Sequence, residues 1–155
     1  MKFLKKFNKN WCHQSDNSLI ENGEDLNSDE SEGCWTPIQC AIFEGNVNIL
    51  RKLIAKGVNV NLMFAEDRFT PLTFAIYLNK VKIVRFLIEN GADLNMPDSK
   101  GWTPILTSID EEKEDNILIL KLLIEKGGTV PLVMLQFVFS TCVKSIISTH
   151  FISNG

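Results

Sequence analysis

The sequence predicts an all-α repeat solenoid made of stacked helix–turn–helix units, and two recurring features carry this prediction. A four-residue motif, which consists of an aromatic residue, threonine, proline and an aliphatic residue, occurs three times. The threonines of the three copies are Thr36, Thr70 and Thr103, which are 34 and 33 residues apart. An apolar helical pattern follows each phrase and ends at a glycine, which is Gly57, Gly91 or Gly127. A period of this size indicates supersecondary units that stack rather than one closed globule.

The second copy shows the expected order of elements within one unit. Thr70 suits the N-cap of a first helix, because its hydroxyl can accept a hydrogen bond from an unpaired backbone N–H. The proline after it fits the first helical position, where its missing N–H costs nothing. The apolar residues then predict a first helix through Ile76, a tight turn at Asn79 and a second helix through Ile88. Gly91 ends the second helix, as expected for a residue that adopts a left-handed conformation after the last turn.

The clear copies of the unit span residues 34–66, 67–99 and 100–128. The third copy carries additional residues within the acidic segment 110–115, which predicts a longer, acidic turn between its two helices. A less obvious copy precedes them, because residues 19–27 match residues 87–95 almost position for position.

Residues 1–33 are therefore interpreted as a degenerate N-terminal repeat. The alternative is a disordered acidic leader, since residues 15–33 contain seven acids and no base. The end repeat is favoured because a disordered segment has no reason to reproduce the repeat phrase in phase.

The tail, residues 129–155, breaks the pattern and is apolar almost without interruption up to Val143. A repeat stack needs an end unit that covers its last apolar face, so a C-terminal capping helix is expected. The alternative is a membrane anchor, but the apolar run is interrupted by Gln136 and is shorter than the roughly 20 residues that a spanning helix needs.

Composition argues against several classes of function. The net charge of −3 provides no basic field for nucleic acid. The four cysteines form no C-x-x-C pair, and no companion histidines stand at zinc spacing, so reduced thiols in the cytoplasm and no metal site are expected. The chain has no glycine-rich phosphate loop and no recognisable nucleophile–histidine spacing. These features predict a protein without catalytic residues or cofactors.

The repeats resemble those of the ankyrin repeat family. The family phrase Thr-Pro-Leu-His-x-Ala has counterparts at residues 36–41, 70–75 and 103–108, and Gly91-Ala92-Asp93-Leu94-Asn95 matches a second family phrase. The resemblance covers at least residues 34–128. One departure is that the usual histidine is replaced by Gln39, Thr73 and Leu106, which we expect to loosen the hydrogen bonding between turn and helix.

The resemblance implies an L-shaped stack with hairpin fingers and a non-enzymatic role in protein–protein interaction, as an adaptor or inhibitor. It implies that a protein partner, rather than nucleic acid or a small-molecule substrate, docks on the fingers and the concave face formed by the first helices. The expected partner-binding residues are Trp35, Phe43, Glu44, Glu66, Asp67, Phe69, Tyr77, Leu78, Ser99, Lys100, Trp102, Asp110 and Glu111. We expect a cytoplasmic monomer, and the alternative is a tail-anchored membrane protein that displays the repeats to the cytosol.

An aromatic residue precedes each threonine of the repeated phrase, and two interpretations of this row remain open. Trp35, Phe69 and Trp102 could anchor a partner, because aromatic residues are enriched at binding hot spots. Alternatively, they could pack against the neighbouring finger and stabilise the stack. An exposed apolar row indicates binding only if it is contiguous.

Overall fold

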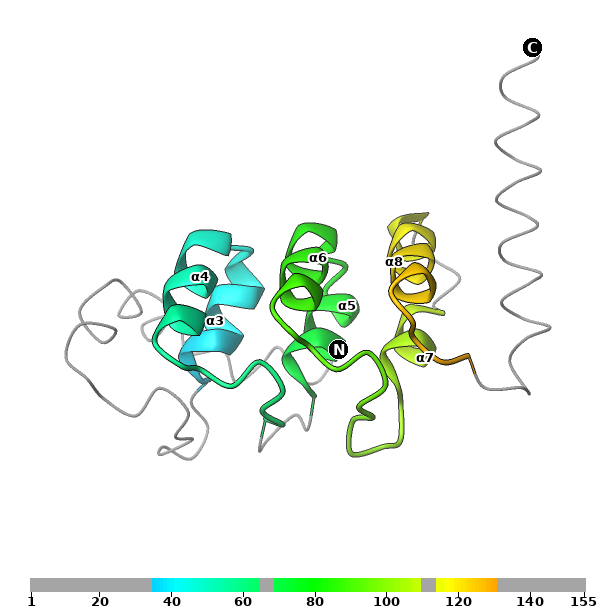
Figure 1. The fold of residues 1–155 in the computed structure, drawn as a ribbon, viewed down its shortest axis with the longest axis horizontal. Helices are drawn as coiled ribbons and strands as arrows, with labels where there is room; N and C mark the ends of the chain where they lie inside the picture. The colour runs from blue at the N-terminus through cyan, green and yellow to red at the C-terminus, as the bar shows by residue number, and fades with distance from the viewer. Residues whose placement is uncertain (1–34, 65–68, 110–113, 131–155) are drawn as a thin grey trace, which may run out of the picture.

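A computed structural model of the chain describes residues 35–64, 69–109 and 114–130. This part of the chain forms three helix pairs that stand in a row, with the connecting loops projecting from one end of the pairs (Figure 1). The pairs are α3 (Pro37–Glu44) with α4 (Val47–Ala55), α5 (Pro71–Tyr77) with α6 (Val81–Glu89), and α7 (Pro104–Ser108) with α8 (Glu114–Glu125). The predicted all-α repeat solenoid is confirmed.

The first helix of each pair begins at the threonine of the repeated phrase. Thr36, Thr70 and Thr103 are the N-caps of α3, α5 and α7, and a proline occupies the first turn of each helix. Each threonine hydroxyl accepts a hydrogen bond from the backbone N–H three residues later, at 3.4, 3.1 and 3.4 Å respectively. The Thr-Pro phrase therefore starts helices, as its capping chemistry predicts.

We expected weaker hydrogen bonding between the turn and the first helix where histidine is replaced, and this expectation is wrong for the first two repeats. The Gln39 Oε1 atom accepts a hydrogen bond from the Thr36 N–H at 2.8 Å, and the Thr73 Oγ1 atom accepts one from the Thr70 N–H at the same distance. Each pair thus forms a reciprocal capping box. Both side chains offer an oxygen three residues after the cap, which is all this contact requires. Leu106 has no acceptor in its side chain, so the expectation holds only for α7.

The turns inside and after the pairs use left-handed backbone. Gly45 between α3 and α4 has a φ of 77°, and Asn79 between α5 and α6 has a φ of 55°. The predicted glycine terminators Gly57, Gly91 and Gly127 have φ values of 88°, 88° and 96°. Only glycine, and less often asparagine, adopts this conformation at low cost, which explains why these residue types mark the period.

The core is a continuous layer between the helix pairs. Its fully buried side chains come from equivalent positions of successive repeats. Examples are Ile38, Leu72 and Ile105 of the first helices and Leu53, Leu87 and Leu123 of the second helices. Cys40 of α3 is also buried, at 1% exposure, among these apolar side chains. Burial within each helix pair and burial against the next repeat both stabilise such a stack.

Asparagine side chains tie consecutive fingers together. The Asn61 side chain donates to the Gly91 carbonyl at 3.1 Å and accepts from the Asp93 N–H at 2.8 Å. One repeat later, the Asn95 Oδ1 atom accepts from the Thr129 N–H at 2.7 Å. These contacts fix the spacing of the loops that project from the helix pairs.

Two predicted segments lie outside the described residues, and a third differs in its boundary. The degenerate repeat at 1–33 and nearly all of the tail at 129–155 belong to the undescribed part and stay predictions. The acidic turn expected at 110–115 ends earlier, because α8 begins at Glu114. As a result, α8 has 12 residues where α4 and α6 have 9.

Candidate functional site

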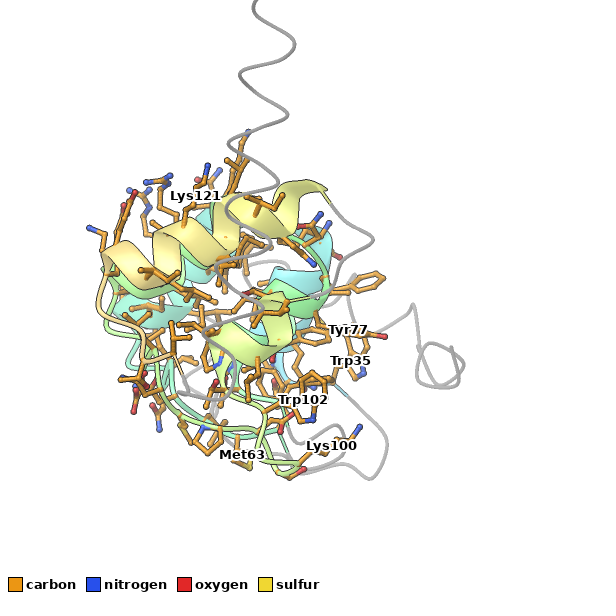
Figure 2. The ribbon with its side chains drawn as sticks, turned by 90° about the vertical axis from the view of Figure 1, so that its right-hand side faces the viewer. Trp35, Met63, Tyr77, Lys100, Trp102 and Lys121 are labelled. Atoms are coloured by element: carbon orange, nitrogen blue, oxygen red, sulfur yellow. The ribbon has the colours of Figure 1, made fainter. Side chains whose placement is uncertain are left out.

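The predicted contact residues differ widely in exposure. Glu44, Tyr77, Ser99, Lys100 and Trp102 are exposed, whereas Trp35, Phe43, Phe69 and Leu78 are half-buried. Glu66, Asp67, Asp110 and Glu111 lie outside the described residues. Figure 2 shows Trp35, Tyr77, Lys100 and Trp102 on the same side of the stack, opposite Lys121 of α8. The side that carries these four residues is the one formed by the first helices and the fingers.

Trp35 contributes to packing between the first and second described repeats. Its ring meets the rings of Phe43 and Phe74 edge to face, with centroids 5.2 and 5.6 Å apart. Phe74 is 4% exposed and also contacts Phe64 and Phe69, at centroid distances of 5.9 and 6.0 Å. Edge-to-face pairs of this kind stabilise aromatic clusters beyond their buried area. Trp35 therefore helps to pack the stack, as the alternative interpretation expects, but it does so against the helices α3 and α5 rather than against a finger.

The aromatic side chains of the next repeat are more open. Phe69 stacks on Tyr77, with centroids 5.4 Å apart and an interplanar angle of 25°. Tyr77 is nevertheless 46% exposed and Trp102 is 53% exposed. The aromatic row is therefore uneven, since its first two members share contacts with Phe74 and its third faces solvent.

A surface cavity of about 420 Å³ lies beside these side chains. Phe69, Tyr77 and Trp102 form its aromatic walls, and Leu106, Thr107 and Ile109 contribute from α7 and its C-terminal end. Asp98 and Lys100 of the third finger complete the lining. A concave site lined mostly by apolar side chains, with a few polar groups at defined places, is typical of binding pockets.

The third finger is held firmly where it borders the cavity. The Asp98 Oδ1 atom accepts hydrogen bonds from the backbone N–H groups of Lys100 and Trp102, both at 2.8 Å. The Asp98 N–H in turn donates to the Trp102 carbonyl at 2.9 Å. The backbone of Trp102 is thereby fixed, and its exposed indole is presented from a rigid turn.

Sequence reasoning identified only part of this site. Of the predicted contact residues, Phe69, Tyr77, Lys100 and Trp102 line the cavity, whereas Trp35, Phe43 and Glu44 lie one repeat away. The residues that sequence reasoning missed are Asp98, Leu106, Thr107 and Ile109. One signal could have found them: four residues after its N-cap, the second repeat has Phe74 and the third has the much smaller Thr107.

Comparison with protein families agrees with the geometry. A profile of ankyrin repeats matches three copies over residues 16–98 and 65–133, which together make up more than half of the chain. The chain belongs to the ankyrin repeat family. A search of curated proteins finds no match to it. Ankyrin repeats are generally protein-interaction modules and are typically non-enzymatic.

Within the described ankyrin repeats, no group of three or more His, Cys, Asp or Glu side chains could hold a metal ion. The helices in the same part of the chain are all too short or too polar to cross a membrane. The tail beyond residue 130 is not described, so its two interpretations, cap and anchor, stay predictions.

Proposed function

We propose that the chain is a non-enzymatic adaptor or inhibitor that binds a protein partner through its fingers and the concave face of its first helices. The observation that carries the proposal is the exposed aromatic surface of Tyr77 and Trp102 beside the cavity. Large apolar side chains held at the surface of a rigid scaffold favour binding, because little side-chain freedom is lost on association. Tyrosine and tryptophan are also enriched at binding hot spots.

The proposal assigns different roles to the predicted contact residues. Tyr77, Lys100 and Trp102 would contact the partner, whereas Trp35 and Phe43 would hold the neighbouring interface of the stack. A protein fits this surface better than nucleic acid does, because the chain carries a net charge of −3. The biological role of the chain would then depend on which protein it binds, because the chain itself would catalyse no reaction.

Affinity capture from the native cell tests this proposal with two matched variants. Trp102→Ala removes the exposed indole, and Lys121→Ala removes an exposed side chain on the opposite side of the stack (Figure 2). We expect a specific protein to be retained by the wild type and by Lys121→Ala, and lost by Trp102→Ala. Both exposed substitutions should change the unfolding free energy by no more than about 0.5 kcal/mol.

The same experiment can contradict the proposal. Identical capture by all three proteins would place the contact surface elsewhere. Capture of nothing above the matrix control by the wild-type chain would argue against a protein-binding role.

A further inference from the structure

The cavity lies where the preceding repeat interface holds a phenylalanine ring. Phe74 and Thr107 occupy the same position in successive repeats, four residues after the N-cap threonine. By the same count, Phe69 and Tyr77 are the counterparts of Trp35 and Phe43. The two interfaces can therefore be compared residue by residue.

At the interface between the first two described repeats, the aromatic side chains pack against one another. The ring of Phe74 lies against Trp35 at 5.6 Å, and Trp35 lies against Phe43 at 5.2 Å. Phe74 is almost completely buried and Trp35 and Phe43 are half-buried. One aromatic side chain from the following repeat thus packs against Trp35, the first member of the aromatic pair in the repeat before it.

In the second interface, as far as the structure describes it, Thr107 stands in the place of that phenylalanine. Phe69 and Tyr77 stack on each other, and the third repeat lines the cavity beside them with Trp102 of its finger and with Thr107 of α7, whose side chain has no ring. The Thr107 hydroxyl is turned to its own helix and donates to the Thr103 carbonyl at 3.1 Å. Tyr77 remains 46% exposed, and a cavity of about 420 Å³ remains between the two repeats.

We infer that this cavity receives an aromatic side chain from the protein partner, in the place that Phe74 fills one repeat earlier. The inference rests on the proposed function and specifies the chemistry of its partner. The volume is near the lower end of the roughly 300–1,000 Å³ range of ligand pockets, which suits one large side chain and its backbone. The ring enters beside Trp102 and Tyr77, which Figure 2 shows on the same side of the stack, and it makes the edge or offset contacts that aromatic rings prefer.

A capped amino acid provides a direct probe of the cavity. N-acetyl-tryptophanamide is titrated into the full chain and followed by NMR at the methyl groups of Leu106, Thr107 and Ile109, with N-acetyl-glycinamide as the control for backbone binding. We expect saturable, ring-dependent shifts at these methyl groups. Shifts of equal size with the glycine probe, or none with the tryptophan probe, would overturn the inference.

Two substitutions at one position separate the filling of the cavity from other effects. Thr107→Phe supplies the missing ring from within the chain, and Thr107→Val keeps the volume of the side chain while it removes the hydroxyl. We expect Thr107→Phe to weaken binding of the tryptophan probe about tenfold or more, and Thr107→Val to leave it unchanged. Equal affinity of all three proteins would show that the probe binds elsewhere.

A folding defect in Thr107→Phe would not leave the inference undecided. Tyr77→Leu then serves as the second variant, because Tyr77 is exposed and forms one wall of the cavity. It should weaken the tryptophan probe several-fold while the helical circular dichroism is unchanged. Undiminished affinity in a folded Tyr77→Leu protein would overturn the inference.

The failure of this inference can be told apart from the failure of the proposed function. A partner that is captured by the wild type, lost by Trp102→Ala and retained by a folded Thr107→Phe protein leaves the proposed function intact and overturns the aromatic anchor. Loss of the partner from both variants supports both conclusions. If the wild type captures no protein, the proposed function fails, while the tryptophan probe still decides whether the cavity accepts a ring.

Discussion

Replacement of Phe74 by alanine should be among the most damaging single changes in the described part of the stack. The side chain is 4% exposed and its ring contacts Trp35, Phe64 and Phe69. Buried phenylalanine-to-alanine changes cost about 3–5 kcal/mol, because transfer energy is lost and a cavity remains. Three aromatic contacts disappear together, and each contributes roughly 0.5–1.5 kcal/mol beyond buried area, so we expect a loss of about 4 kcal/mol.

The location of Phe74 gives this substitution a second consequence. Its three ring contacts come from different parts of the stack: Trp35 from the first described repeat, Phe64 from the finger between the repeats, and Phe69 from the start of the second repeat. In a repeat stack, stability is approximately a sum of repeat terms and nearest-neighbour interface terms. Phe74→Ala weakens one interface term, so we expect the urea transition to become broader as well as to shift to lower urea concentration.

Urea unfolding followed by both circular dichroism and tryptophan fluorescence measures these effects. Thr107→Ala is the matched control, since it truncates the equivalent, half-buried position of the next repeat and should cost about 1 kcal/mol or less. A loss below about 1 kcal/mol in Phe74→Ala, or equal losses in both variants, would refute the assignment of Phe74 as the residue that closes the aromatic cluster.

Three further predictions concern the local contacts of the repeats. Gln39→Leu leaves the buried Thr36 N–H without its acceptor and should lower the unfolding free energy by about 1–3 kcal/mol in urea unfolding; no change would mean that the capping box adds nothing. Asn61→Ala removes the tie to the next finger and should accelerate hydrogen exchange of the Asp93 amide, with a loss of about 1 kcal/mol; unaltered exchange would contradict the tie. Gly45→Ala places a Cβ at a φ of 77°, and beyond the adjacent residues its nearest neighbour is the flexible end of Lys80 at 3.8 Å, so a loss of roughly 1–2 kcal/mol in thermal unfolding should come from the backbone alone.

The sequence predicts the local structure of the repeats well, because each signal acts over a few residues. Thr70 followed by proline can start α5 through its own hydroxyl, and Gly91 can end a unit through its own backbone freedom. The replacement of the family histidine was harder to judge, since it depends on geometry rather than on residue type. Gln39 and Thr73 both place an oxygen within reach of the cap, although neither resembles histidine in size.

The candidate site was less predictable, because it is formed between repeats rather than within one. Phe43 and Tyr77 occupy the same position in successive repeats, seven residues after the N-cap threonine, yet the first side chain is half-buried and the second is 46% exposed. What differs is the residue that meets the aromatic pair from the following repeat. A search for motifs within each unit cannot detect this difference, because the covering residue belongs to the next unit.

This dependence on the neighbouring repeat gives the stack a simple way to acquire a pocket. The core positions can stay unchanged, since Leu72 and Ile105 are equally buried on either side of the cavity. A single small residue, Thr107, stands at the position that Phe74 fills in the preceding interface, and Tyr77 beside it is 46% exposed. A repeat stack tolerates such a change because each interface is one term among several. If the proposed binding site is correct, the same position sets both the strength of one interface and the exposure of the aromatic surface that a partner would contact.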